Sequence, residues 1–492
     1  MAATQTGEAP FWRDRLEKTL LAPVRALRPS YLPLLMVYFA YGATGLIGIA
    51  QAFWVRKSLT WSPAELSGLA IWFGLPWTIK MVFGELVDTV PLLGSQRRTY
   101  VFAGATLVAT SMLLLAGSAG GWITSISPDH IYVIASLLSV TGLVVQDVVA
   151  DAMSTEVVTR VNPDGSPRPQ AEIDHDLGMV QVLGRLALSL GIFCTAGLAG
   201  LVANYLSYEK VFLLGLIVPL LSVSGAVLVR LETAERRPID WRILGGGLAF
   251  GAMVAAIGLL QVPLAQEIVF ALSLAVVIGM LVRVTGEIDP VLRMRIATAA
   301  LIIFAFRATP TVGEGWNWFA IDVLGFSEGF FGVLGQIGAG VAIAALWLWS
   351  DTVTRRPVAE VLVWLTVLGT IMSLPLLVLV FQWYKAIGLS PHTIALFETV
   401  ATSPFAHLSM IPVLTLVAIY APAGHRATWF ALMASLMNLA LQGGALLTKY
   451  LNIIFHVERG AYANLPALTV TVLAVGLLLP LTAIALFGRR LR

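Results

Sequence analysis

Long apolar stretches separated by short polar segments dominate the pattern of this 492-residue chain. Runs of about 20 apolar residues match the length of a helix that crosses a bilayer, and they are too long for the strands of a membrane barrel. The pattern therefore predicts an all-α integral membrane protein with about fourteen transmembrane helices. The predicted spans are 31–54, 63–86, 99–120, 130–153, 177–204, 210–230, 243–262, 266–284, 294–320, 328–349, 358–382, 391–419, 427–450 and 463–487.

Composition supports this prediction and excludes several other classes of protein. Hydrophobic residues make up 58% of the chain, charged residues only 12%, and the mean hydropathy is +0.84. Soluble proteins carry about 25% charged residues, so this chain cannot cover a surface that faces water. Its basic residues are scattered between apolar spans, which excludes a nucleic-acid binder. The single cysteine, Cys194, lies in an apolar run, so we expect no disulfide, metal site or cofactor.

The distribution of positive charge predicts the orientation in the membrane. Of the 31 Lys and Arg residues, 22 fall on the side of the N-terminus, 6 on the other side and 3 within the spans. Cytoplasmic loops carry an excess of Lys and Arg, so both termini are expected in the cytoplasm. We expect a multi-pass protein of a bacterial inner membrane.

An internal repeat at an offset of 265 residues divides the chain. Four identities relate the first span and its exit loop to the ninth span, and three aromatic positions also coincide. The loop with Asp88 and two arginines is echoed by the shorter loop with Asp351. Parallel repeats of this kind are typical of major facilitator transporters. We therefore expect a tail at 1–30, six-helix bundles at 31–230 and 293–487, a linker with two extra helices at 231–292, and a tail at 488–492. The identities are Ala43 with Ala308, Thr44 with Thr309, Leu59 with Leu324 and Ser62 with Ser327.

The loop between the second and third spans resembles, in stretched form, the loop motif of the same superfamily. Its residues are Gly84, Asp88, Gly94, Arg97 and Arg98. Glycine permits close approach of helices, and an aspartate can pair with nearby cations at a helix end. We expect this loop to hold the cytoplasmic side together during conformational change and not to bind the substrate.

Four segments resemble the folate–biopterin transporter family of the major facilitator superfamily. They are Leu75–Tyr100, Val144–Glu156, Ala308–Gly332 and Ile411–Ala440. Two of them, LPWTIK and QDVVADA, are also similar to muropeptide permeases, which often carry two additional spans. The resemblance implies transport of a folate or a pterin. Where plant-like members have an amide before Ala-Thr-Pro, this chain has Arg307, which changes the anion that can be held.

Three charged residues fall at similar depth in the cytoplasmic half of the first bundle. They are Lys80, Asp147 and Arg185. They either line the cavity, where a cation meets a substrate carboxylate and an aspartate exchanges a proton, or they form a static ion-pair network. Asp151 shares a helix face with Asp147 but lies near water, and for it and for Glu156 the pattern favours the ion-pair network. Gln146 and Gln181 are expected to complete the same polar patch.

Arg307 is the strongest candidate for binding the substrate. It lies near the middle of the ninth span, where a cation is costly unless it faces water or an anion. The nearest acid in this span, Glu314, follows Pro310, which breaks the helix as in discontinuous transporter helices. Trp316 and Trp318 follow and either stack on a flat substrate ring or belong to an interfacial aromatic belt.

Span twelve contains two further titratable residues. Glu398 lies near its outer end and is an alternative partner for Arg307, and His407 lies near its middle. His407 either relays protons or, as the more common arrangement, bonds as a neutral ring to a backbone carbonyl.

We find no catalytic motif and no P-loop lysine, so we expect no enzyme and no ATP-driven pump. The sequence favours a secondary active transporter that moves a folate- or pterin-like organic anion by alternating access, coupled to a proton or another ion. A permease for muropeptides or other amphiphilic anions is the first alternative, and a non-transporting membrane scaffold or assembly factor is the second. A scaffold does not need charges inside the membrane, which argues against it. We expect a monomer in the lipid bilayer.

Overall fold

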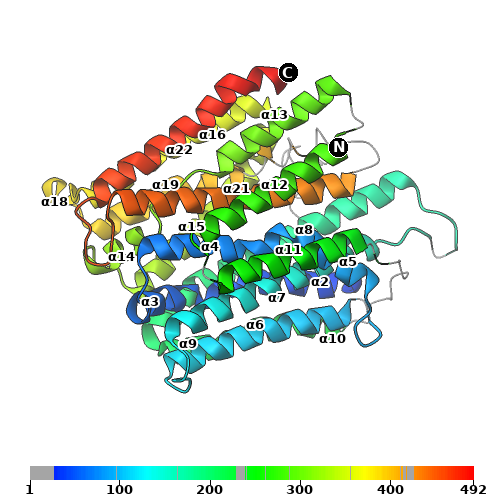
Figure 1. Cartoon of the computed structure of the whole chain (residues 1–492), viewed down its shortest axis with the longest axis horizontal. Helices are drawn as coiled ribbons and strands as arrows, with labels where there is room; N and C mark the ends of the chain where they lie inside the picture. Colours follow the sequence, from blue (N-terminus) through cyan, green and yellow to red (C-terminus); the bar gives the residue numbers. More distant parts are fainter. Residues whose placement is uncertain are drawn as a thin grey trace, which may run out of the picture.

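The helices of the protein run roughly along one common direction (Figure 1). The structure is a computed structural model, and it describes residues 27–491 except 96, 163, 229–238, 240, 261, 287–288, 355, 410–411, 414–416 and 418–425. Within these residues it contains helices and three isolated bridges but no strands. The prediction of an all-α membrane protein is therefore confirmed.

The first bundle contains the helices from η1 to α10. Its first span is made of four consecutive helical pieces, and its second span is divided in two after Thr78. The elements are η1 (Pro29–Tyr31), α2 (Leu32–Ala43), η2 (Thr44–Ile47), α3 (Gly48–Ser58), α4 (Pro63–Thr78), α5 (Lys80–Thr89), α6 (Arg98–Ala119), α7 (Pro128–Glu156), α8 (Gln170–Tyr205), α9 (Tyr208–Leu214) and α10 (Ile217–Leu228).

Two extra helices and the second bundle follow. The extra helices, α11 and α12, form a hairpin, and the ninth span is divided into α13 and α14. The elements are α11 (Trp241–Leu259), α12 (Ala265–Val284), α13 (Pro290–Arg307), α14 (Glu314–Asp322), α15 (Glu328–Thr354), α16 (Val358–Met372), α17 (Pro375–Val380), α18 (Tyr384–Ile387), α19 (Pro391–Leu408), α21 (Arg426–Ile454), α22 (Leu465–Phe487) and η3 (Gly488–Leu491).

Local sequence explains where several of these helices begin. Ser62 caps α4, because its hydroxyl accepts the N–H of Glu65 while the Glu65 carboxylate accepts the N–H of Ser62. Ser127 caps α7, and Asp289 caps α13. Each cap is followed by a proline, whose missing N–H needs no partner in the first turn.

Eleven helices of the described residues are long and apolar enough to cross a membrane. They coincide with eleven of the predicted spans. The other three predicted spans, at 294–320, 391–419 and 427–450, fall on α13 with α14, on α19 and on α21. The count of fourteen crossings therefore stays a prediction.

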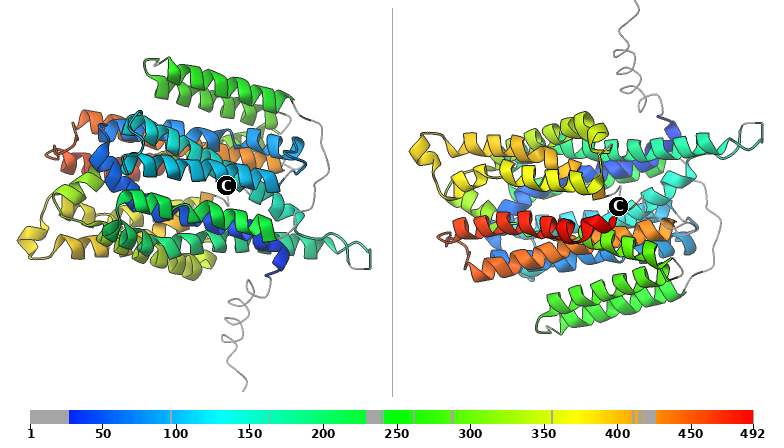
Figure 2. Two further views of the ribbon diagram at one scale, coloured as in Figure 1. Left: turned by 90° about the horizontal axis from the view of Figure 1, so that it is seen from below. Right: turned by 90° about the horizontal axis from the view of Figure 1, so that it is seen from above.

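The two bundles meet along two seams. Helix α4 packs against α21, and α8 packs against α15. At the second seam the backbones touch, because a Cβ on Gly200 would lie 2.4 Å from the Cα of Gly332. The hairpin of α11 and α12 lies outside the bundles (Figure 2, green), where it contacts α4, α5 and α21. It therefore covers the first seam.

The helices of both bundles run between two opposite ends of the molecule. The Arg56 end is the end at which α3 finishes and α4 begins, and the Arg97 end is the opposite one, at which α5 finishes and α6 begins. Among the described residues, three polar contacts join the bundles at the Arg56 end: Arg56 with Asp322 at 2.6 Å, Arg459 with the Leu59 carbonyl at 2.8 Å, and Tyr208 with Glu328 at 3.0 Å.

Candidate functional site

The ninth span is interrupted between α13 and α14. Pro310 lies in the gap, where it cannot supply a backbone donor. Helix α21 supplies partners for the backbone that the break leaves unpaired. The N–H of Thr311 donates to the Thr448 hydroxyl at 2.9 Å, and the Asn452 amide donates to the Val312 carbonyl at 3.2 Å. Side chains of one helix thus stabilise a broken turn of its neighbour, as membrane proteins require.

Arg307 is the last residue of α13, and it is half-buried. Its Nε donates to the Met437 carbonyl of α21 at 3.4 Å. The guanidinium group therefore lies at the side of the broken span that faces α21, within the second bundle. Glu398, the alternative partner predicted from the sequence, lies half-buried on α19. The side chain of His407 lies outside the described residues.

Glu314 and the two tryptophans occupy different surroundings at the start of α14. Glu314 is half-buried and accepts a hydrogen bond from the Asn317 amide at 3.1 Å. Trp316 is half-buried, with its ring 6.1 Å from that of Phe319. Trp318 is 0% exposed, and the guanidinium groups of two arginines of the Arg56 end, Arg56 and Arg459, lie 5.6 and 4.9 Å from its ring centre. In this structure Trp318 therefore offers no ring face to a substrate.

Lys80 is the centre of the charge cluster in the first bundle. It begins α5 directly after the interruption at Ile79. Its ammonium group lies 2.5 Å from a carboxylate oxygen of Asp147 and 2.6 Å from one of Asp151. The Tyr38 hydroxyl donates to Asp151 at 2.7 Å. The two aspartates lie one turn apart on α7, so a single cation can bridge them.

Arg185 completes the positive side of this cluster. It is exposed on α8, and its charge acts on Asp147, Tyr38 and Tyr41. Two aromatic rings that the sequence analysis missed, those of Tyr41 and Trp77, lie beside this charge cluster. Tyr41 and Trp77 stack with centroids 5.8 Å apart, and the Lys80 ammonium lies 5.9 Å from the Trp77 ring. Tyr41 lies in the segment used to identify the internal repeat, and Trp77 lies in a segment that resembles the transporter family. These two similarities were the signals in the sequence that could have pointed to the rings.

The expectation for Gln146 was wrong. Its amide is 3% exposed and donates to the Val101 carbonyl at 3.1 Å and to Ser222 at 3.0 Å. It therefore joins α7 to α6 and α10 on the side away from Lys80. The physical reason is its place on α7, one position before Asp147, which turns it about 100° around the helix. The side chain of Gln181 lies outside the described residues.

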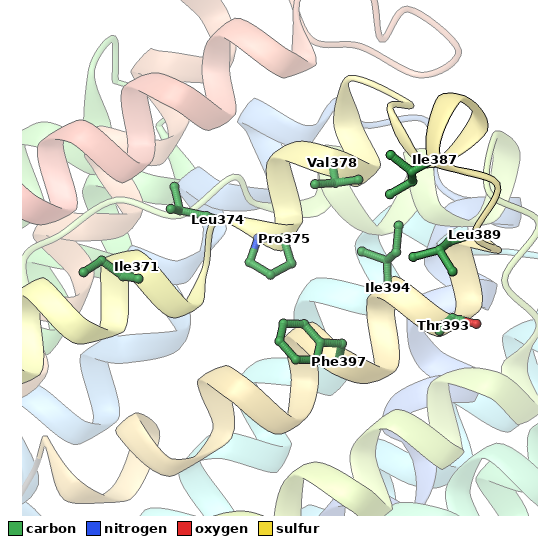
Figure 3. A pocket seen from close by; sticks show the side chains of 9 residues that line it. All are labelled: Ile371, Leu374, Pro375, Val378, Ile387, Leu389, Thr393, Ile394 and Phe397. Carbon is green, nitrogen blue, oxygen red and sulfur yellow. The ribbon is translucent and has the colours of Figure 1, made fainter.

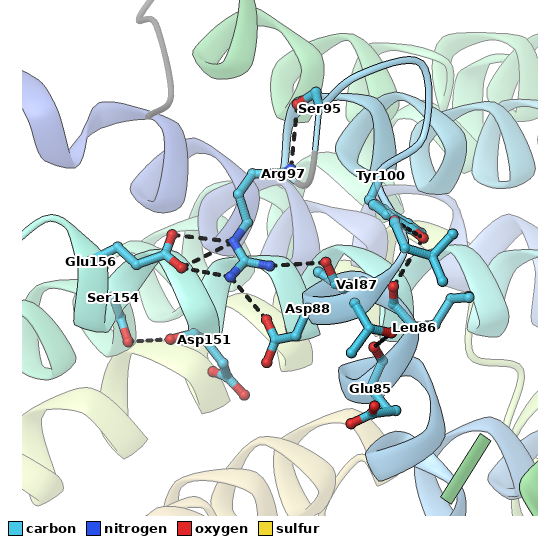
Figure 4. A network of polar contacts seen from close by, with 12 residues as sticks. Glu85, Leu86, Val87, Asp88, Ser95, Arg97, Tyr100, Asp151, Ser154 and Glu156 are labelled. Carbon is cyan, nitrogen blue, oxygen red and sulfur yellow. Dashed lines mark hydrogen bonds and ion pairs between the residues drawn. The ribbon is translucent and has the colours of Figure 1, made fainter. Parts of the chain in front are cut away.

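The predicted loop motif forms a network around Arg97 (Figure 4). Arg97 is 3% exposed, pairs with Glu156 at 2.5 Å and Asp88 at 2.9 Å, and donates to the Val87 carbonyl. Burial lowers the pKa of Arg97, but the hydrogen bonds and charges of Glu156 and Asp88 more than offset this and raise it. Arg98 is exposed. This network fixes the end of α7 that also carries Asp151.

The two glycines of this motif have different roles. A Cβ on Gly84 would meet nothing within 4 Å, so the expected close approach of helices at Gly84 was wrong. Gly94 has a φ of 82°, which lies in the left-handed region that favours glycine. The turn, and not helix packing, therefore explains the glycine at position 94.

An apolar cavity of about 500 Å3 opens between α16, α17 and α19 (Figure 3). Thr393 is its only polar lining residue. Binding an organic anion requires charged or strongly polar groups, so this cavity does not fit such a ligand. Its lining residues are Ile371, Leu374, Pro375, Val378, Ile387, Leu389, Thr393, Ile394 and Phe397.

Comparison with known proteins identifies the family. The profile of the BT1 family matches residues 42–491. The chain belongs to the BT1 family. It is 28% identical over 484 residues to "Folate-biopterin transporter" of Synechocystis sp. (strain ATCC 27184 / PCC 6803 / Kazusa), covering 97% of this chain and 85% of that protein. It is 23% identical to "Probable folate-biopterin transporter 2" of Arabidopsis thaliana, covering 90% of this chain and 81% of that protein.

Solved structures show the fold. A mutant of the peptide transporter POT in complex with alafosfalin has a TM-score of 0.64 at 16% identity, with 93% of this chain and 94% of that chain covered. A POT family transporter in complex with 5-aminolevulinic acid has a TM-score of 0.63 at 12% identity, covering 94% and 96%. The resemblance stated above is confirmed, and the BT1 chain is a multi-pass membrane transporter with a major facilitator-type fold.

Proposed function

We propose that this BT1 protein is a secondary active transporter that moves a folate- or pterin-like organic anion by alternating access, coupled to protons. One observation carries the proposal: Lys80 lies between the carboxylates of Asp147 and Asp151, next to the stacked rings of Tyr41 and Trp77. Aromatic faces suit a flat heterocycle, and a cation suits a substrate carboxylate. The names of the Synechocystis and Arabidopsis relatives support the same class of substrate.

The roles of the residues follow from their chemistry. Arg307, Lys80 and Arg185 hold the anionic groups of the substrate, with Arg307 as a two-pronged donor. Asp147 exchanges the coupling proton. Its carboxylate competes with the anionic substrate for Lys80, so protonation of Asp147 and binding of the substrate favour each other. Trp316 contributes an aromatic wall. Glu398 and His407 remain candidates for the proton path in the second bundle.

The contacts between the bundles support alternating access. Three polar contacts close the Arg56 end, and they lie in loops and at helix ends, where a rocking motion separates them most. The excess of positive charge in the loops of the Arg97 end orients that end toward the cytoplasm. The protein then lies in a bacterial inner membrane with both termini inside and its outer side closed.

Uptake by a host that lacks the corresponding transport tests the proposal. Cells expressing the wild-type chain should accumulate labelled folate or biopterin. Arg307→Lys keeps the charge but loses the fork, so uptake should fall about tenfold, the equivalent of about 1.4 kcal/mol, while the protein still inserts. Arg295→Lys is the matched control, because Arg295 is exposed on the same helix and should transport normally. Wild-type affinity in a well-folded Arg307→Ala protein would contradict the role of Arg307. Uptake of a muropeptide but of neither folate nor biopterin would assign the protein a different class of substrate.

A further inference from the structure

Glu314 lies at the first seam, between the two bundles. The preceding residue, Gly313, has a φ of 74°, and a Cβ there would lie 2.9 Å from Thr448 of α21 and 3.1 Å from the hydroxyl of Ser67 of α4. Helix α14 therefore starts in a narrow space between α4 of the first bundle and α21 of the second bundle. The Glu314 carboxylate also acts electrostatically on the hydroxyl of Tyr132, which belongs to α7 of the first bundle.

The surroundings of this carboxylate are polar and aromatic but not positively charged. Among the described residues, its interactions are with the Asn317 amide and Tyr132, and no lysine or arginine pairs with it. The Tyr132 hydroxyl is influenced by the polar side chains of Gln51 and Ser136, and its ring packs edge-on against Phe73 with centroids 5.9 Å apart. A half-buried carboxylate without a cation needs another donor to offset its loss of water.

The cations of the proposed site lie at a different level along the seam. On α4 and α5, Lys80 follows Ser67 by thirteen residues, which is about 20 Å at 1.5 Å per residue. On α21, Met437, which accepts from Arg307, precedes Thr448 by eleven residues, or about 16 Å. Glu314 therefore lies toward the Arg56 end, and Lys80 and Arg307 lie toward the Arg97 end.

We propose that Glu314 is the subsite for the donor edge of the pteridine ring. A pterin presents a ring N–H and an exocyclic amino group side by side, and these two donors match the two oxygens of one carboxylate. Asn317 orients that carboxylate, and Tyr132 and Trp316 flank the flat ring. This inference rests on the proposed function and assigns the substrate an orientation: the ring toward the Arg56 end, and the anionic tail toward Lys80 and Arg307.

Binding to the purified full-length protein, with three probes that separate the two ends of the substrate, tests this assignment. Folate carries both the pteridine and the carboxylates, biopterin carries the ring without carboxylates, and p-aminobenzoyl-glutamate carries the tail without the pteridine. Glu314→Gln replaces one acceptor oxygen by a donor, so affinity for folate and biopterin should fall at least tenfold. Affinity for p-aminobenzoyl-glutamate should stay within twofold of wild type. Glu458→Gln is the matched control, because Glu458 is exposed in a loop of the Arg56 end and should change none of the three.

The possible outcomes are distinct. Equal loss for all three probes would assign Glu314 a structural role and overturn the inference, as would unchanged biopterin affinity. If the wild-type protein binds neither folate nor biopterin, the proposed function itself fails, and the Glu314 variant is not needed to show it. Selective loss of the two ring-bearing probes supports the subsite.

Discussion

Replacing Lys80 by methionine removes the cation from between two carboxylates. Asp147 and Asp151 then face each other one turn apart on α7 with no ammonium group between them. Methionine has a similar length but no charge, so the change tests the ion pair more than the packing. The protein should be less stable in the absence of substrate.

The structure sets the size of the effect. The side chain of Asp147 is 13% exposed, that of Lys80 27% and that of Asp151 49%. Removing one partner of a buried pair costs about 3–5 kcal/mol. Because Asp151 reaches water and keeps the Tyr38 hydroxyl, the lower figure of about 3 kcal/mol applies. In double-mutant cycles we expect about 2 kcal/mol of coupling between Lys80 and Asp147, against less than about 1 kcal/mol between Lys80 and the exposed Asp151.

The assay is equilibrium unfolding of the purified protein in mixed micelles, with Lys80→Met, Asp147→Asn and Asp151→Asn singly and in pairs. The Lys80→Met/Asp147→Asn double variant should recover most of the stability lost in Lys80→Met, and Lys80→Met/Asp151→Asn should recover little. Equal recovery by both partners would refute the reasoning from burial. A Lys80→Met protein as stable as wild type would show that the ion pairs do not hold the bundle together.

Three further predictions concern the frame around the site. A lysine at position 97 cannot bind Glu156, Asp88 and the Val87 carbonyl together, so Arg97→Lys should lower the free energy of unfolding by about 1.5–3 kcal/mol. Arg98→Lys is the control and should leave the free energy of unfolding unchanged, because Arg98 is exposed. Gly332→Ala places a methyl group 2.6 Å from the Cα of Gly200, so overpacking should lower the free energy of unfolding by about 1–3 kcal/mol and lower the melting temperature. Gly251→Ala is the control, because its methyl group meets nothing within 4 Å, and it should not lower the melting temperature. A reporter fused to the C-terminus should report the cytoplasm, and an external signal would contradict the charge argument.

Depth along a span could be predicted from the sequence, but the direction of a side chain could not. Counting 1.5 Å per residue from the predicted ends put Lys80 and Asp147 at the same level, and the structure brings them to 2.5 Å. The same count put Gln146 at that level, yet it points to α6 and α10. Hydropathy states how far a residue lies from the water, while its neighbour depends on rotation about the helix axis.

Contacts between distant spans were also beyond the sequence. Pro310 signalled the break after Arg307, and the structure ends α13 at Arg307, because proline cannot continue the hydrogen-bond ladder. Nothing in the pattern signalled that Thr448 and Asn452 of α21 would satisfy the freed backbone. The sequence left the ring of Trp318 as either a stacking surface or part of an interfacial aromatic belt, and only the fold reveals that arginines from two other segments cover it.

The proposed alternating access requires the Arg56 end to open at moderate cost. Arg56 and Asp322 form an ion pair there, and their side chains are 23% and 26% exposed. The Tyr462 hydroxyl also donates to Asp322. Burial and this hydrogen bond raise the pKa of Tyr462 to about 12, so the hydroxyl stays a donor. Three polar contacts between bundles, at about 0.5–3 kcal/mol each, total a few kcal/mol. Reversing a two-state equilibrium from 1:99 to 99:1 takes about 5.5 kcal/mol of differential binding. In the proposed binding mode, cations hold one end of the substrate and Glu314 holds the other, so the substrate contacts both bundles. Its binding free energy would then shift the equilibrium between the closed and open states of the Arg56 end.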